Sequence, residues 1–264
     1  MWESVDRSRP LPRAAAAASL EFSSSPRTIA VVGAGGRVGC SLTAAALARE
    51  LAHGRPTGLG VVLVDADRFG GGLDVLLGYE QAPGARWPDV VGAGSGVPVA
   101  DVIAALPATS LSHSLLSMDR RESELDEEFV QSFIRNVRSQ LTVVVDISRD
   151  WASPIAQAAL TSADKVVVVM TSHVRSCASA VRFLEHLQSL DPRGHACVAA
   201  LREVSYGASA ASIRRALPIP VGARVPHIRR LSRLAESGIP GAVVPRALAK
   251  SSRLLLAHLV AIGA

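Results

Sequence analysis

Three features of this sequence predict an α/β fold, with a doubly wound, mostly parallel sheet and helices on both of its faces. Short runs of Val, Ile, Leu and Ala alternate with longer Ala- and Leu-rich segments that favour helix, which is typical of βαβ units. Aromatic residues make up only 4% of the chain and apolar residues 48%, which favours a helix-covered parallel sheet over a β-sandwich. A length of 264 residues suits one large domain, which we place at 27–264 after a flexible Pro-, Ala- and Ser-rich tail at 1–26.

The first predicted strand and helix enclose a glycine-rich loop. The β-branched segment 28–32 predicts a buried strand, and the Ala- and Leu-rich segment 41–52 predicts a helix. The loop between them therefore directs backbone N–H groups from a helix N-terminus, which is where a phosphate would bind.

This loop matches the phosphate-binding pattern GxxxxGK[ST] only in part. Ala34 replaces the first glycine, and Gly39 occupies the position of the second. Cys40 replaces the lysine, and Ser41 supplies the hydroxyl. The loop is therefore present, but its lysine is missing. Nucleotide binding and a purely structural strand-to-helix turn both stay open as interpretations.

Two further strands end in aspartates. The segment VVLVDAD at 61–67 ends in Asp65 and Asp67, whose spacing would place both carboxylates on one face of a strand. The segment LTVVVDI at 141–147 carries Asp146. Because α/β proteins bind ligands at the carboxyl ends of their strands, these aspartates are candidates to hold Mg²⁺ or to position water. The alternative is that they are ordinary turn and capping residues.

The rest of the chain continues the alternation. A glycine-rich segment at 69–78 and a turn with the sequence PGARWP at 83–88 follow the second strand, and acidic residues open a helix at 123–140. Further strands are predicted over 115–118, 165–171, 196–201 and 219–225. Further helices are predicted over 99–106, 154–162, 176–190, 208–217, 227–237 and 245–262.

Composition limits the classes of function. The net charge of +5 permits contact with nucleic acid or an anionic membrane without requiring it. The densest basic region contains Arg214, Arg215, Arg229, Arg230 and Arg233.

Three cysteines are too few for a disulfide framework and favour a reducing cytoplasm. No apolar run has the length of a membrane span, and we expect no signal peptide.

With the loop, VDAD and VVVDI in this order, the chain resembles the deviant P-loop ATPases of the MinD/ParA class. More closely, it resembles the actinobacterial CpaE-like proteins, also called septum site-determining proteins. The resemblance begins at residue 27 and rests on VVGAGGRVGCSLTAAALA at 31–48, VVLVDADRFGGGLDVLLG at 61–78, PGARWPD at 83–89, VVVDISRD at 143–150, ADKVVVVMTSHVRSCASA at 163–180 and the segment 233–259.

The resemblance implies an adenine nucleotide, ATP or ADP, bound with Mg²⁺. The nucleotide-binding residues that it implies are Gly33, Gly35, Gly36, Arg37, Val38, Gly39, Cys40 and Ser41. The metal ligands would be Ser41, Asp67 and Asp146, and the catalytic carboxylates Asp65, Asp67 and Asp146.

The two lysines of this class are absent, because Gly35 and Cys40 stand at their positions. Arg37 replaces the second glycine of the pair and could supply a cation, although its planar fork differs from an ammonium group. Because the lysine stabilises charge on the transferred phosphate, the resemblance implies a weak ATPase at most.

The implied function is regulatory. We expect a cytoplasmic protein, in contact with the membrane surface in one alternative, that takes part in septum-site determination or in positioning a pilus or secretion apparatus. Its partners would be proteins of that machinery and a second copy of the chain. One alternative is a pseudo-ATPase scaffold that acts only through protein contacts, and another is a positioning protein that binds DNA nonspecifically through the basic region.

Three local alternatives complete the hypotheses. The Cys40 thiol at a helix N-terminus would have a lowered pKa and could sense redox state, although a small residue without that role is favoured. His173 and Cys177 lie four residues apart, but no further metal ligand lies near them in the sequence. The last helix, with Lys250, Arg253 and His258, would lie on a membrane surface or, as we favour, pack against the sheet.

Overall fold

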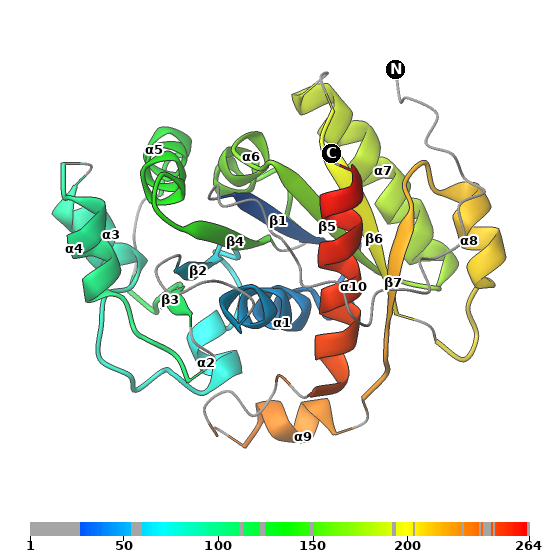
Figure 1. The fold of residues 1–264 in the computed structure, drawn as a ribbon, viewed down its shortest axis with the longest axis horizontal. Coiled ribbons are helices and arrows are strands. Elements are labelled where there is room, and N and C mark those ends of the chain that lie inside the picture. The colour runs from blue at the N-terminus through cyan, green and yellow to red at the C-terminus, as the bar shows by residue number, and fades with distance from the viewer. Residues whose placement is uncertain are drawn as a thin grey trace.

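The computed structural model contains one seven-stranded sheet in which every pair of neighbouring strands is parallel (Figure 1). It describes residues 27–53, 60–94, 96–110, 113–121, 125–147, 150–191, 194–202, 204–228, 230–237, 239, 244 and 246–262. The predicted tail at 1–26 lies outside this part of the chain. The strand order is β3-β2-β4-β1-β5-β6-β7, so β1 lies at the centre of the sheet.

The elements alternate as the sequence predicts. The strands are β1 (Thr28–Gly33), β2 (Val61–Asp65), β3 (Ser114–Leu116), β4 (Thr142–Ile147), β5 (Lys165–Thr171), β6 (Ala196–Arg202) and β7 (Val221–Val225). The helices are α1 (Cys40–His53), α2 (Leu73–Leu77), α3 (Trp87–Ala93), α4 (Val99–Ala105), α5 (Glu127–Arg138), α6 (Pro154–Thr161), α7 (Val174–Leu190), α8 (Ala210–Ala216), α9 (Leu231–Ala235) and α10 (Arg246–Ile262).

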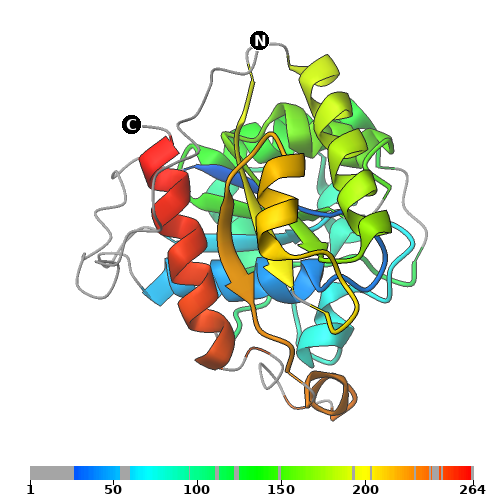
Figure 2. The same cartoon turned by 90° about the vertical axis from the view of Figure 1, so that its right-hand side faces the viewer.

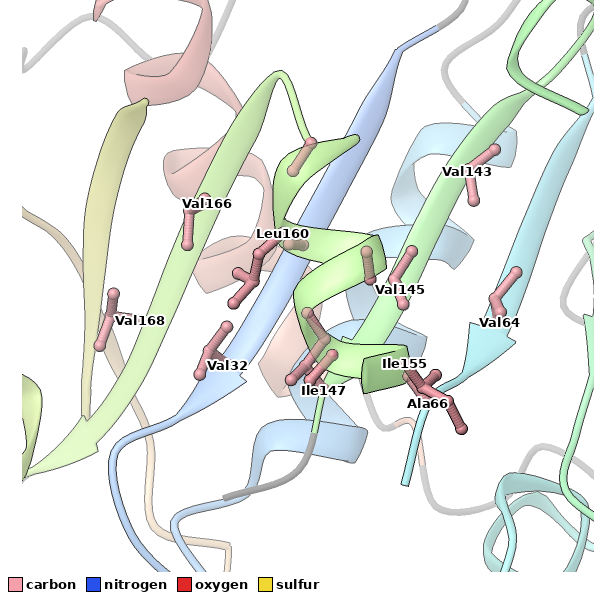
Figure 3. Close-up of a cluster of buried hydrophobic side chains, with 14 of the residues drawn as sticks. Val32, Val64, Ala66, Val143, Val145, Ile147, Ile155, Leu160, Val166 and Val168 are labelled. Atoms are coloured by element: carbon pink, nitrogen blue, oxygen red, sulfur yellow. The ribbon is translucent and has the colours of Figure 1, made fainter. Parts of the chain in front are cut away.

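Helices cover both faces of the sheet and bury two apolar clusters. One cluster lies under α1, α2 and α10, and the other lies mainly under α3, α5, α6 and α7. Figure 2 shows α10 and α7 on opposite sides of the sheet. Figure 3 shows Ile155 and Leu160 of α6 above the strands, on the same side as Val32 of β1, Val145 of β4 and Val166 of β5. Because both faces are covered, β1, β2, β4 and β5 are buried along their whole length.

Several element boundaries differ from the prediction for identifiable reasons. The second strand ends at Asp65, so Asp67 lies in the following loop. Helix α5 begins at Glu127, because the Asp126 side chain caps it by accepting from the Phe129 N–H. Within the segment expected to be a turn, Trp87 already begins α3, and the Asp89 carboxylate accepts from the Arg86 N–H at the start of this helix.

Helix α10 uses its apolar side within the fold. Leu255, Leu256 and Leu259 are buried in the cluster shared with α1, β6 and β7. The favoured expectation that this helix packs against the sheet is therefore confirmed. In the part of the chain that the structure describes, no helix has the length and hydropathy that a membrane span requires.

Candidate functional site

The glycine-rich loop follows the central strand and leads directly into α1. Ala34 N–H donates to the Val169 carbonyl oxygen of β5 at 2.8 Å, which holds the start of the loop against the sheet. Gly35, Arg37 and Gly39 then take positive φ angles of 136°, 59° and 93°. Arg37 is the only described non-glycine residue with a positive φ.

The N–H groups of this loop are free to bind a ligand. Among the described residues, none of the backbone N–H groups from 35 to 41 donates a hydrogen bond within the protein. The unpaired N–H donors of the loop and the positive end of the α1 helix dipole therefore point to the same place, and this arrangement suits a phosphate.

Cys40, at the position of the lysine, points toward the sheet. Its Sγ lies 3.3 Å from the Val31 carbonyl oxygen and 3.4 Å from the Ile147 carbonyl oxygen. Burial, followed by the negative charge of Asp146, raises the thiol pKa well above its ordinary value. The thiol is thus protonated at neutral pH, and the expectation of a lowered pKa at this helix N-terminus is wrong, because desolvation outweighs the dipole.

Asp146 lies beside the loop with one oxygen unpaired. Its backbone pairs in register with Val31 of β1 and Asp65 of β2, and the residue is only 2% exposed. Oδ1 is buried and has no hydrogen-bond partner among the described residues. Burial raises the pKa of Asp146 to about 6, while the Ser41 hydroxyl and the Cys40 thiol act as hydrogen-bond donors that lower it.

These residues fit a Mg²⁺ ion. A buried carboxylate oxygen without a partner, close to a serine hydroxyl and below a row of free N–H groups, is the donor set that a Mg²⁺–phosphate complex uses. No group of three or more His, Cys, Asp or Glu residues in the described chain could hold a metal alone, and the pair His173 and Cys177 gains no third ligand there. Magnesium commonly takes its remaining ligands from phosphate and water.

Asp65 organises the loop that follows its own strand. Oδ1 accepts from the Asp67 N–H at 3.0 Å, and Oδ2 accepts from the Leu73 N–H at 2.9 Å and from the Ser117 hydroxyl at 3.3 Å. Burial, followed by the charge of Asp146, raises the pKa of Asp65 to about 7, and the backbone donors partly oppose this. The catalytic role expected for Asp65 stays a prediction, and its visible role is to hold the loop between β2 and α2.

Asp67 lies in this loop and not on the strand, contrary to the expected shared strand face. Its Oδ1 accepts from the Phe69 N–H at 3.3 Å, and its backbone carbonyl accepts from Gly70 N–H. Its charge nevertheless raises the pKa of both Cys40 and Asp146, so it lies within electrostatic range of the glycine-rich loop. A pocket of about 260 Å³ separates the segment 66–69 from the N-terminus of α6.

One residue beside the loop was not identified from the sequence. Arg202, the last residue of β6, donates from Nη2 to the Arg37 carbonyl oxygen at 2.9 Å. The period-two alternation of a strand would have placed it on the same face as Ala200 and Val198. However, nothing in the sequence shows that β6 lies next to β5, or that β5 lies next to β1.

The basic region does not form one continuous surface on a single element. Arg214 and Arg215 are exposed on α8, whereas Arg230 and Arg233 are exposed at α9. These two helices lie apart in both views of the molecule (Figures 1 and 2). Arg229 lies outside the described residues.

No protein-family model matches the chain. In sequence, the chain is 41% identical over 165 residues to an uncharacterized protein of Mycobacterium tuberculosis strain H37Rv and to its counterpart in strain CDC 1551. That match covers 62% of this chain and 45% of each relative, so the chain spans about half the length of the curated relatives it matches.

Solved structures match over most of the chain. A ParA family ATPase from Chlorobium tepidum superposes with a TM-score of 0.76 at 20% identity, covering 89% of this chain and 99% of its own. The septum site-determining protein MinD of Pyrococcus horikoshii, complexed with Mg-ADP, superposes with a TM-score of 0.68 at 16% identity, over 88% and 94%. A complex of a Cyanothece McdA variant with ATP gives a TM-score of 0.63 at 18% identity, over 90% and 97%. The chain therefore has the fold of the MinD and ParA P-loop ATPases.

Proposed function

We propose that this protein is a nucleotide-binding regulator that holds ATP or ADP with Mg²⁺ at the loop between β1 and α1. The observation that carries the proposal is the row of unpaired N–H groups beside the unpaired Oδ1 of Asp146. The nucleotides present in the MinD and McdA structures of the same fold support it. Gly36, Val38 and Gly39 would offer their N–H groups to the phosphates.

Each acidic or hydroxyl group then has a separate role. Ser41, Asp67 and Asp146 would hold Mg²⁺, which when bound neutralises charge on the phosphates. Asp65 would hold the segment that carries Asp67, through its bonds to the N–H groups of Asp67 and Leu73.

We expect hydrolysis to be slow. Cys40 carries no charge, and its thiol lies against the Val31 and Ile147 carbonyl oxygens. The loop therefore lacks the ammonium group that would stabilise charge on the transferred phosphate. Occupancy of the site, more than turnover, would set the state of the protein.

A titration of the purified protein with a fluorescent ATP analogue, with and without Mg²⁺, tests this proposal. We expect saturable binding that Mg²⁺ strengthens. Gly39→Asp should abolish binding, because it places a carboxylate in the loop at a φ of 93°. Gly92→Asp is the matched control, since a side chain there meets no atom within 4 Å. Absence of binding by the wild-type protein would refute nucleotide recognition.

We further propose that the nucleotide state governs self-association and contact with proteins that position a division, pilus or secretion apparatus. The MinD of Aquifex aeolicus, which shares this fold, is a cell division protein and forms a complex with MinC, and this supports this part of the proposal. Light scattering of the protein with and without Mg-ATP checks it, and a mass that does not change with nucleotide would contradict nucleotide-driven dimerisation.

A scaffold that has lost nucleotide binding is the second candidate. The inward position of the Cys40 thiol favours it, because the lysine position is filled by a packed side chain. The scaffold hypothesis expects Gly39→Asp and Asp146→Asn to leave partner binding unchanged. Loss of partner capture in both folded variants would exclude it.

A further inference from the structure

We propose that Arg202 is the phosphate-binding cation of this site and replaces, from a different strand, the lysine that the loop lacks. This inference rests on the proposed function, since the phosphate would be that of the bound nucleotide. The positive charge would come from a residue that lies 162 positions after Cys40 in the chain.

Arg202 reaches the loop directly. Its Nη2 donates to the Arg37 carbonyl oxygen at 2.9 Å. A Cβ built on Gly39 would lie 3.8 Å from its Nη1. The guanidinium group therefore spans the loop from Arg37 to Gly39, next to the residues whose N–H groups are unpaired.

Strand order explains this contact. Arg202 pairs with Thr171 at the carboxyl end of β5, and β5 pairs with β1, which leads into the loop. Along β6, Val198 and Ala200 face the cluster under α1 and α10, so Arg202 lies on the face that α1 covers. A long side chain at that position crosses the end of β5 and arrives at the loop.

The charge of this guanidinium is not compensated within the protein. In the described part of the chain, no carboxylate forms an ion pair with Arg202. Its Nε is buried and has no hydrogen-bond partner among those residues. Burial lowers the pKa of Arg202, yet an arginine stays protonated in proteins. A half-buried cation with an unpaired donor is unfavourable unless an anion arrives.

A phosphate supplies what this group lacks. Guanidinium and phosphate form charge-assisted hydrogen bonds, and Nη1, which lies 3.8 Å from a Cβ built on Gly39, is the donor nearest the loop. Arg37 is the other cation that could bind the phosphate. Its side chain is exposed to solvent, and its backbone carbonyl oxygen accepts the hydrogen bond from Arg202. The geometry thus separates the two arginines: Arg37 shapes the loop and Arg202 faces its ligand.

Calorimetric titration with Mg-ATP and with inorganic tripolyphosphate tests the assignment. We expect Arg202→Met to weaken both ligands about 10- to 100-fold, as for loss of a charge-assisted hydrogen bond, and Arg202→Lys to lose less because it keeps the charge. Arg215→Met removes the same charge from an exposed position on α8 and should change affinity less than about threefold. Thermal unfolding checks that each variant is folded, and Arg202→Gln replaces Arg202→Met if the latter is not.

The outcomes separate this inference from the proposed function. If wild type binds Mg-ATP, Gly39→Asp does not, and Arg202→Met binds like wild type, the role of Arg202 is refuted and nucleotide binding stands. If tripolyphosphate binds through Arg202 and ATP binds no better, the cation is confirmed and adenine recognition fails. If neither ligand binds to the wild-type protein, both proposals are overturned.

Discussion

Asp146 is a buried acid whose pKa of about 6 exceeds its ordinary value of 3.8. The folded protein therefore binds this proton more tightly than the unfolded chain, and its stability falls as pH rises from about 4 through 6. We expect ligand-free Asp146→Asn to be more stable than wild type by about 1–3 kcal/mol at pH 8, with the difference vanishing near pH 4. Urea unfolding at both pH values, without Mg²⁺, measures this. A difference independent of pH would contradict the raised pKa.

Cys40 offers a gain-of-function test at the same scale. Lysine is too long for the space between the Val31 and Ile147 carbonyl oxygens, so in Cys40→Lys its ammonium group must extend toward the mouth of the loop. There it adds the missing charge, and we expect ATP affinity to rise about tenfold, with faster phosphate release. Cys40→Ala keeps a small neutral residue and should match wild type in a phosphate-release assay. Equal affinity of the lysine and alanine variants would show that the site does not bind phosphate at this position.

Between β2 and α3, one buried arginine holds the elements together. Arg86 donates to the Asp74 carboxylate at 3.3 Å and to the carbonyl oxygens of Tyr79 and Ala82. Asp74 is 1% exposed, and the Ser117 Oγ lies 3.1 Å from its carboxylate and 3.3 Å from that of Asp65, so one hydroxyl proton is shared between the two acids. This chain of contacts connects the PGARWP segment to the base of the site.

Removing this arginine should be costly. Arg86→Met leaves the exposed Arg120, at 3.5 Å, as the remaining ion-pair partner of the buried Asp74. It also removes a donor from the Tyr79 and Ala82 carbonyl oxygens, and we expect a loss of about 2–4 kcal/mol in the free energy of unfolding. Arg121→Met, which removes an exposed partner of Asp89, is the control and should leave the free energy of unfolding nearly unchanged. Denaturant unfolding compares the two, and similar losses would mean that Arg86 is not the centre of this network.

At the scale of the molecule, α10 completes one layer of the fold. Leu255 of this helix is fully buried in the cluster shared with the sheet and α1, whereas Val260 of the same helix is 39% exposed. Leu255→Ala should therefore destabilise the protein by about 2–5 kcal/mol, and Val260→Ala by less than about 1 kcal/mol. Thermal unfolding tests the pair. Equal effects would indicate that α10 does not pack as a core helix.

The fold class and the position of the loop could be predicted from local sequence. Apolar strands such as 165–171 alternate with amphipathic helices, and this pattern determines a helix-covered parallel sheet. The glycines around Arg37 and the start of α1 likewise specify a loop with free N–H groups, because those preferences act between residues close in the chain. The short helices α2 and α3 escaped prediction, since their Gly- and Pro-rich sequences resemble turns.

Contacts between distant segments were decided only by the tertiary structure. The sequence predicts Asp65 and Asp146 near strand ends. Only strand order determines that Asp146 lies under the loop and that Arg202 crosses β5 to reach it. Burial depends on the whole fold, and it raises the pKa of Cys40 where the sequence predicted a lowered one. The same folding brings the N–H groups of Asp67 and Leu73 to the Asp65 carboxylate. Local conformational preferences determine which helices and strands form. Long-range packing determines which charged groups lie close together, because electrostatic interactions depend on distance and dielectric and not on sequence separation.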